Sequence, residues 1–284
     1  MSRLSLIEQA LVAYGTRFPN HPRKWWLHER LRTRLGVSVD RAMEVRRQGL
    51  RWRLNPADFA ERNLFWLGTK DPWDLQRLRS LTRPGDVVVD VGANFGYYGI
   101  SLARHVAPGG LVHALEPIPT NFDRLRHHIA ANHLEAIVRA YRLGAGDRAE
   151  TVRMHVPEGN SGHAAVSSGG EVADVPLTTL NAFVKAEGLD RVNTVVLDVE
   201  GYEERALMGA HGMLERFRPM VVVELFPPVM HEQGSSPEAV ARVLRGMGYR
   251  LFHTRRRRLI PLETMPQGDV RINAFAIHRD RPAP

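Results

Sequence analysis

From residue 86 onward the sequence alternates short apolar segments with stretches of helical periodicity, and this alternation constrains the fold more than any other feature. Five segments are largely apolar: 87–91, 111–115, 137–143, 193–199 and 220–225. Strands buried on both faces of a parallel sheet have this composition. Helical patterns separate them, so the sequence predicts an α/β fold with a doubly wound, mostly parallel sheet. We expect residues 249–253 and 271–278 to close the sheet as an antiparallel pair, which makes the last strand antiparallel.

The first 85 residues lack this alternation. Two helical patterns lie on either side of a break between Pro19 and Pro22, and Gln48-Gly49 has the composition of a tight turn. Residues 45–47 and 50–52 on either side of that turn predict a hairpin. We therefore divide the chain into an N-terminal extension of helices and a hairpin, residues 1–85, and one large domain, residues 86–284.

Composition excludes several classes of protein. The chain has no cysteine, which rules out disulfides, thiolate nucleophiles, zinc–thiolate sites and iron–sulfur clusters. No apolar run approaches the ~18 residues of a membrane span. Glu8 and Gln9 interrupt the stretch in which an export signal needs apolar residues. We therefore expect a cytoplasmic protein without a transmembrane segment.

Basic residues are concentrated at the N-terminal end of the chain. The net charge is +8, yet residues 1–85 hold 17 Lys and Arg against 8 Asp and Glu, while residues 86–284 are nearly neutral at −1. A basic segment with Trp25, Trp26 and Trp52 fits a protein that binds RNA or an anionic membrane surface. A second interpretation is genomic base composition, because 36 of the 39 basic residues are arginine. We favour the second interpretation.

A glycine-containing loop with an acidic residue on either side indicates a ligand site. Asp90, Gly92 and Gly96 lie between the first apolar strand and the following helix, and Glu116 ends the next strand. Ligands of open α/β sheets bind outside the carboxyl ends of the strands, where backbone N–H groups and a carboxylate can hold an adenosine. An NAD-dependent oxidoreductase and a methyltransferase both fit this arrangement. Asn94 replaces the middle glycine of the dinucleotide motif, and Asp90 suits a cationic ligand better than a pyrophosphate.

Four sequence blocks resemble the FkbM-type family of S-adenosylmethionine-dependent methyltransferases. They are VVVDVGANFGYYGISLA, LEPIPTNFDRLRHHIAAN, VVLDVEGYEERALMGA and RPMVVVEL, and the resemblance extends over about residues 45–278. It implies a class I, Rossmann-like fold, S-adenosyl-L-methionine as the cofactor and, most often, O-methylation. One departure is Asn181, where the family usually has aspartate, in a segment that we expect to be structural.

The resemblance also implies a set of cofactor-binding residues. The glycine loop would surround the methionine end of the cofactor, Glu116 would hold the ribose, and the segment around Asp147 would lie near the adenine. The expected set is Asp90, Gly92, Ala93, Asn94, Gly96, Glu116, Pro117, Ala145 and Asp147.

The catalytic residues are expected where the fourth strand ends, at the edge that faces the reactive methyl group in related enzymes. Asp198 and Glu200 are two residues apart in an extended segment, so they point the same way. Two neighbouring carboxylates raise the pKa of one of them, which would suit a general base. They could instead bind a divalent cation, or Glu200 or Glu203 could cap the next helix. His163 in a Gly/Ser-rich loop is the histidine candidate, and Glu224 with His231 could line the acceptor pocket.

The residues and the family resemblance together predict a bacterial, cytoplasmic methyltransferase. We expect its acceptor to be a hydroxyl of a small molecule, sugar, lipid or natural product. We assign no metal ligand and expect no nucleic-acid partner, because the motif [DN]-P-P-[YF] of base-methylating enzymes is absent from the fourth strand. The N-terminal extension would cover the acceptor or form a homodimer contact. The arginines at 255–258 could bind an acidic acceptor, although we favour a solvated hairpin.

Overall fold

The computed structural model describes residues 4–18, 21, 23–156 and 171–282. The described chain divides into two compact units, one ending at Pro72 and the other beginning at Trp73. Helix α4 (Pro72–Leu81) therefore falls almost entirely in the second unit. The domain boundary at residue 85 and the role of the N-terminal extension remain predictions.

The first unit contains three helices and one hairpin. Its elements are α1 (Leu6–Arg17), α2 (Lys24–Arg34), β1 (Met43–Arg47), β2 (Leu50–Leu54) and α3 (Phe59–Leu67). The predicted hairpin register is confirmed, with Val45 opposite Trp52, and both Gln48 and Gly49 adopt the positive φ that a two-residue turn needs. Trp52 is completely buried, so the expectation that it could contact RNA or a membrane is wrong. Its indole N–H instead donates to the Arg47 carbonyl.

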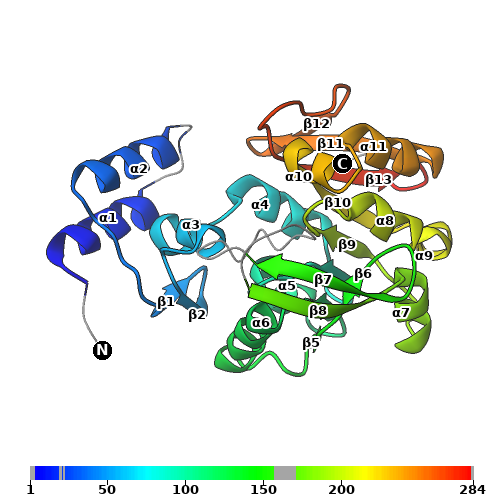
Figure 1. Cartoon of the computed structure of the whole chain (residues 1–284), viewed down its shortest axis with the longest axis horizontal. Helices are drawn as coiled ribbons and strands as arrows, with labels where there is room; N and C mark the ends of the chain where they lie inside the picture. The colour runs from blue at the N-terminus through cyan, green and yellow to red at the C-terminus, as the bar shows by residue number, and fades with distance from the viewer. Residues whose placement is uncertain (1–3, 19–20, 22, 157–170, 283–284) are drawn as a thin grey trace. The chain divides into compact units, whose positions relative to one another are not determined.

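The second unit is built on an eight-stranded sheet (Figure 1). Its strands, in spatial order, are β12 (Arg258–Pro261), β11 (Tyr249–Arg255), β13 (Ile272–His278), β10 (Met220–Leu225), β9 (Thr194–Leu197), β3 (Val87–Val91), β4 (Leu111–Leu115) and β5 (Val138–Tyr141). The five strands from β10 to β5 are parallel, and β13 runs antiparallel to β10. The predicted α/β fold with an antiparallel last strand is confirmed.

Helices and a smaller sheet complete this unit. The helices after α4 are α5 (Tyr97–Val106), α6 (Pro119–Ala131), α7 (Leu180–Ala186), α8 (Glu203–Met208), α9 (His211–Phe217), α10 (Pro227–Glu232) and α11 (Pro237–Gly246). The smaller sheet has the order β6 (Gly144–Ala145), β8 (Glu171–Thr178), β7 (Glu150–Val156). The core lies between the sheet and its helices and is made mainly of Val, Leu and Ala.

The helix predicted after the fourth strand is in fact two helices. Apolar spacing from Tyr202 to Leu214 predicts one helix, but α8 ends at Met208 and α9 begins at His211. A Cβ at Gly209 would lie 2.0 Å from the Gly146 carbonyl oxygen, so the chain bends where its backbone packs against the end of β6. This contact is distant in the sequence, which is why periodicity does not reveal it.

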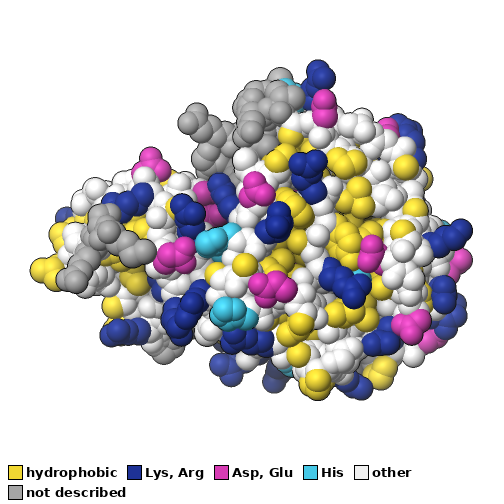
Figure 2. Space-filling model, turned by 90° about the horizontal axis from the view of Figure 1, so that it is seen from below, with side chains coloured by type: hydrophobic (Ala, Val, Ile, Leu, Met, Phe, Trp, Pro, Cys, Tyr) yellow, Lys and Arg dark blue, Asp and Glu magenta, His cyan; other side chains and the backbone are white. Residues whose placement is uncertain are grey.

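Basic side chains form no continuous field on the face shown in Figure 2. There, Lys and Arg side chains lie scattered among acidic and apolar ones. The four arginines at 255–258 are all exposed, and Arg255 pairs with Arg258 across the β11–β12 hairpin, as favoured from the sequence.

The strand order reverses between β3 and β9, and both strands end at the same edge of the sheet. Val91 pairs with Leu197 at that edge, and the Asp198 N–H donates to the Val91 carbonyl at 3.0 Å. Gly92 follows with φ +78°, and a Cβ there would lie 1.8 Å from the Asp198 carbonyl oxygen. Such a reversal is where open α/β sheets bind their ligands.

We predict that Gly92→Ala is far more destabilising than a glycine replacement at an open position. Gly188 also has a positive φ, +61°, but a Cβ there would meet nothing within 4 Å. Gly188→Ala should lower the free energy of unfolding by about 1 kcal/mol, the cost of a left-handed alanine. Gly92→Ala should cost at least about 3 kcal/mol, because backbone must also move. Equal losses in urea unfolding would contradict the close packing of Gly92.

Candidate active site

The loop after β3 folds back over the end of β4. The N–H groups of Gly92 and Ala93 both donate to the Leu115 carbonyl at 2.9 Å. Asn94 has φ +50°, and Gly96, with φ +96°, caps the start of α5. Asp90 is buried, and one of its carboxylate oxygens accepts a hydrogen bond from the Gly99 N–H of α5 at 2.8 Å. The end of β3 and the first turn of α5 are thus joined by one buried acid.

Glu116 joins the ends of two neighbouring strands. Its Oε2 accepts from the Asn94 N–H at 2.7 Å, and its Oε1 accepts from the Ile118 N–H at 2.9 Å. The side chain is 3% exposed. Burial raises the pKa of Glu116 to about 7, against the lowering effect of its hydrogen bonds. The Asn121 side chain also hydrogen-bonds to this carboxylate, which leaves one of its four lone-pair positions for a ligand.

The segment predicted to lie near an adenine does lie beside Glu116 and Pro117. A Cβ at Gly144 would be 3.5 Å from the Pro117 side chain. Ala145 is buried and pairs with Thr178 of β8. Asp147 follows, and its Oδ1 is buried without a hydrogen-bond partner among the described residues. Such an oxygen is costly unless something donates to it, which makes it a candidate ligand acceptor.

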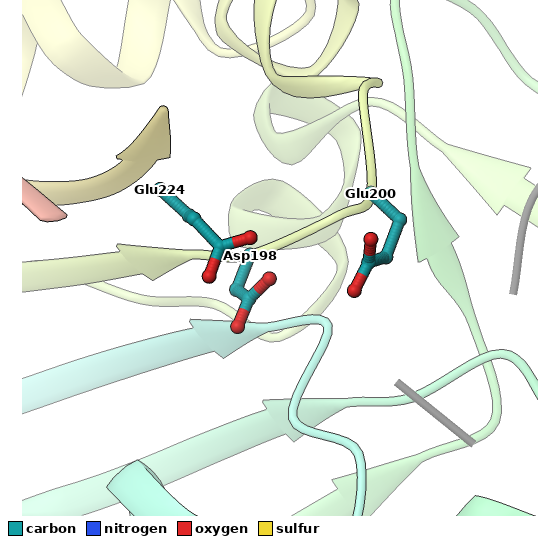
Figure 3. A group of neighbouring side chains, drawn as sticks. All are labelled: Asp198, Glu200 and Glu224. Atoms are coloured by element: carbon teal, nitrogen blue, oxygen red, sulfur yellow. The ribbon is translucent and has the colours of Figure 1, made fainter. Parts of the chain in front are cut away.

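Three carboxylates meet at the ends of β9 and β10. Asp198 and Glu200 follow β9, and Glu224 lies near the end of β10. Each offers an oxygen within 4.8 Å of the others, and Figure 3 shows the three groups turned toward one another. Arg271 lies 3.3 Å from Glu224 and supplies positive charge to the cluster. The sequence predicts that Asp198 lies beside Glu200 and that Glu224 lines the acceptor pocket. The structure brings all three carboxylates together.

Glu200 is the unusual acid of this cluster. It has φ +51°, which is strained for a residue with a side chain. Burial raises its pKa well above the ordinary value, and the charges of Glu224 and Asp198 raise it further, while Arg271 lowers it. An acid that holds its proton until higher pH is a stronger base once it has lost it. The spacing of the three carboxylates would also accept a divalent cation, in competition with Arg271.

Glu203 holds the segment that carries these acids. One of its carboxylate oxygens accepts from the N–H groups of Val199 and Gly201, each at 3.2 Å. Its other oxygen is buried without a hydrogen-bond partner among the described residues. Burial raises the pKa of Glu203 to about 7. The expected helix cap is not observed, because no described side chain caps the N-terminus of α8, and Glu203 instead stabilises the turn that precedes this helix.

Other sequence candidates lie elsewhere. His163 falls outside the described residues. His231 is exposed on α10. Asn181 has the structural role expected of it, because its side-chain oxygen accepts from the Met213 N–H at 2.8 Å and so joins α7 to α9.

Sequence reasoning missed the residues that surround Glu224. Asn273 of β13 pairs directly with Glu224, and its amide donates to Asp74 of α4 at 2.9 Å and to the Tyr98 hydroxyl at 3.2 Å. The one available signal was Asn273 itself, a polar residue within an apolar strand. Nothing in the sequence places Asp74 or Arg271 beside that strand.

Comparison with known proteins agrees with this geometry. The Methyltransferase FkbM domain matches residues 90–251, which is more than half of the chain. The chain belongs to the FkbM methyltransferase family. The match begins at Asp90 and includes every described residue of the candidate site except Arg271, Asn273 and Asp74.

Individual relatives of this FkbM-family chain are distant. It is 28% identical over 205 residues to 31-O-demethyl-FK506 methyltransferase FkbM of Streptomyces tacrolimicus, covering 59% of this chain and 74% of that protein. It is 27% identical to Methyltransferase sdnD of Sordaria araneosa over 50% of this chain and 66% of that protein. The solved Methyltransferase FkbM of Methylobacillus flagellatus KT shares 14% identity, with a TM-score of 0.45, over 75% of this chain and 52% of that one.

No helix in the described part of the chain is both long and apolar enough to cross a membrane.

We predict that the stability of Glu203→Gln, measured against that of wild type, increases as the pH rises. The pKa of Glu203 is raised from 4.5 to about 7, so folding retains a proton that the unfolded chain loses above pH 4.5. Its contribution to stability is present at low pH and is lost as the pH rises through about 7. Urea unfolding at about pH 5.5 and about pH 8.5 measures the difference. The exposed Glu135→Gln is the control, and an equal effect of Glu203→Gln at both pH values would contradict the shift.

Proposed function

We propose that this FkbM-family protein is an S-adenosylmethionine-dependent O-methyltransferase. One observation carries the proposal: an acid of raised pKa, Glu200, lies beside the loop at the strand-order reversal, within reach of two other carboxylates. A hydroxyl is a poor nucleophile at neutral pH, and a nearby base makes its attack feasible.

The residues present fit S-adenosylmethionine. One oxygen of Glu116 can accept from a ribose hydroxyl in addition to its present partners, and the other can do so where the second hydroxyl replaces the Asn121 side chain. The Oδ1 of Asp147, which has no hydrogen-bond partner in the described part of the chain, suits the adenine amine. Asp90 joins β3 to α5 through Gly99, and its charge favours a cationic ligand there. Asn94, at the middle glycine position of a dinucleotide motif, disfavours NAD.

Glu200 takes the role of general base, and the other residues orient it. When bound, S-adenosylmethionine supplies a methyl group on a positively charged sulfur. Glu200 would take up the proton that the acceptor hydroxyl loses on methylation. Burial and the charges of Glu224 and Asp198 raise the pKa of Glu200, and the charge of Arg271 lowers it. Glu203 fixes the turn on which Glu200 lies.

The acceptor class is a hydroxyl on a small molecule, sugar, lipid or natural product. The relative FkbM is named for a 31-O-demethyl substrate, which supports transfer to oxygen. The segment after β9 reads Asp198-Val199-Glu200-Gly201, with no proline pair to seat a planar base, so we expect no nucleic-acid acceptor. A cytoplasmic, bacterial origin and a homodimer remain predictions.

We predict that Glu116 governs cofactor affinity and its dependence on pH. Glu116→Ala should weaken S-adenosylhomocysteine about a hundred-fold, the value of two hydrogen bonds to a charged group. The pKa of Glu116 is about 7, so wild-type affinity should fall as the pH drops below 7, because a protonated carboxyl has lost acceptor capacity. Calorimetry across this pH range makes the measurement.

Glu116→Gln separates binding from folding, because glutamine keeps the size of the side chain and one acceptor oxygen. This variant should bind S-adenosylhomocysteine with little dependence on pH. Glu135→Gln, at an exposed position, is the control. If Glu116→Gln binds as tightly as wild type and with the same pH profile, Glu116 does not hold the ribose.

We predict that Glu200→Gln abolishes most of the turnover without affecting cofactor binding. The acceptor is found by presenting sugars, lipids, polyketides and RNA together with methyl-labelled S-adenosylmethionine. With that acceptor, wild-type turnover should rise with pH as Glu200 loses its proton, and Glu200→Gln should lower it by about 10²- to 10⁴-fold. Asp198→Asn should lower turnover less.

Glu215→Gln, on the outer surface of α9, is the matched control and should change neither binding nor turnover. Full turnover by Glu200→Gln would show that Glu200 is not the base. Loss of turnover on adding a chelator, with recovery on adding Mg²⁺, would show that the three carboxylates hold a cation and would contradict the proposed role. Label on RNA alone would contradict the acceptor class.

A further inference from the structure

Exposed apolar side chains are concentrated in one short part of the chain. Among the described residues, eleven large apolar side chains are exposed, and eight of them lie between Leu6 and Leu35. This part of the chain forms α1 and α2 of the first unit. Scattered exposed apolar residues are normal, but a concentration of this kind marks an interaction surface.

Helix α2 leaves its apolar residues partly exposed, while two of its polar residues are buried. Lys24 is 5% exposed, with its ammonium donating to the Phe18 carbonyl at 2.6 Å, and His28 is 2% exposed. Trp26, by contrast, is 51% exposed. A helix at a protein surface normally turns its apolar residues toward the core, so the exposure of Trp26 beside a buried lysine and histidine is unusual.

Six exposed residues of α2 and its C-cap form two parallel rows, because residues four apart lie above one another on a helix. One row is apolar and contains Leu27, Leu31 and Leu35. The other row contains Trp26, Arg30 and Arg34, and the Arg30 guanidinium lies 5.1 Å from the centre of the Trp26 ring. We call these six residues the α2 face.

We propose that the α2 face binds the surface of an anionic lipid bilayer. Leucine and tryptophan side chains enter the boundary between head groups and acyl chains, while arginines on the same helix reach lipid phosphates. The charge is complementary, since residues 1–35 hold seven Lys and Arg against two Asp and Glu. This inference goes beyond the proposed methyl transfer and does not depend on it.

The same observations argue against two other occupants. A second copy of the chain would bring two basic surfaces together in a symmetric contact, which like charges oppose. Single-stranded RNA could stack its bases on the tryptophan and pair its phosphates with the arginines. It would leave the row of leucines exposed to water, because its bases stack on aromatic rings.

Sedimentation with vesicles tests the proposal on the full-length protein. Wild type should sediment with vesicles of phosphatidylcholine and phosphatidylserine, much less with phosphatidylcholine alone, and less at high salt. Trp26→Ala and Leu31→Ala should each lower the partition coefficient roughly ten-fold. Arg30→Gln and Arg34→Gln should each lower it roughly five-fold.

Two exposed residues of the second unit are the matched controls. Met208→Ala and Arg126→Gln should sediment as wild type does. All six variants lie at exposed positions, and circular dichroism checks that they are folded. The proposal is overturned if wild type does not bind the charged vesicles or if the α2 variants bind them as well as the controls. It is also overturned if Trp26→Ala abolishes a dimer seen by light scattering, or if it abolishes binding of an RNA oligonucleotide while vesicle binding is unchanged.

Discussion

The contact between Gly92 and the backbone of Asp198 is the constraint on which the site depends. Parallel pairing of β3 with β9 brings the two segments to the same edge of the sheet, and the absence of a side chain at Gly92 lets the loop pack against the Asp198 carbonyl. The glycine loop is then held next to the segment that carries Glu200. A site for a nucleoside ligand and a cluster of acids are adjacent because two strands that are far apart in the sequence pair directly.

The site retains acids at a cost to stability. Burial raises the pKa values of Glu116 and Glu203 to about 7, and that of Glu200 well above its ordinary value. Backbone N–H groups stabilise the first two, and Arg271 partly stabilises the charge near the third. A core that served only stability would contain apolar residues at these positions. Unfavourable placement of several acids at one strand edge is typical of a functional site.

Much of the fold could be predicted because its signals are local. Strands buried on both faces are continuous apolar runs, and the Gln48-Gly49 turn fixed the register of the hairpin. The acids at the strand ends were found for the same reason, since a carboxylate that ends an apolar run is visible in the sequence. The break at Gly209 was missed because it follows from packing against Gly146. Asp74, Arg271 and Asn273 were missed because only the antiparallel strand β13 and helix α4 bring them to Glu224. The exposure of the α2 face was equally invisible, because helical periodicity alone does not show which side of a helix is covered.

The proposed function requires one ligand to lie across the edge where β3, β4 and β9 end. A crystal structure with S-adenosylhomocysteine tests this directly. We expect Glu116 to contact both ribose hydroxyls, Asp147 to contact the adenine amine, and the sulfur to face the space shared by Asp198, Glu200 and Glu224. A ligand bound elsewhere, or one whose sulfur points away from those three carboxylates, would contradict it.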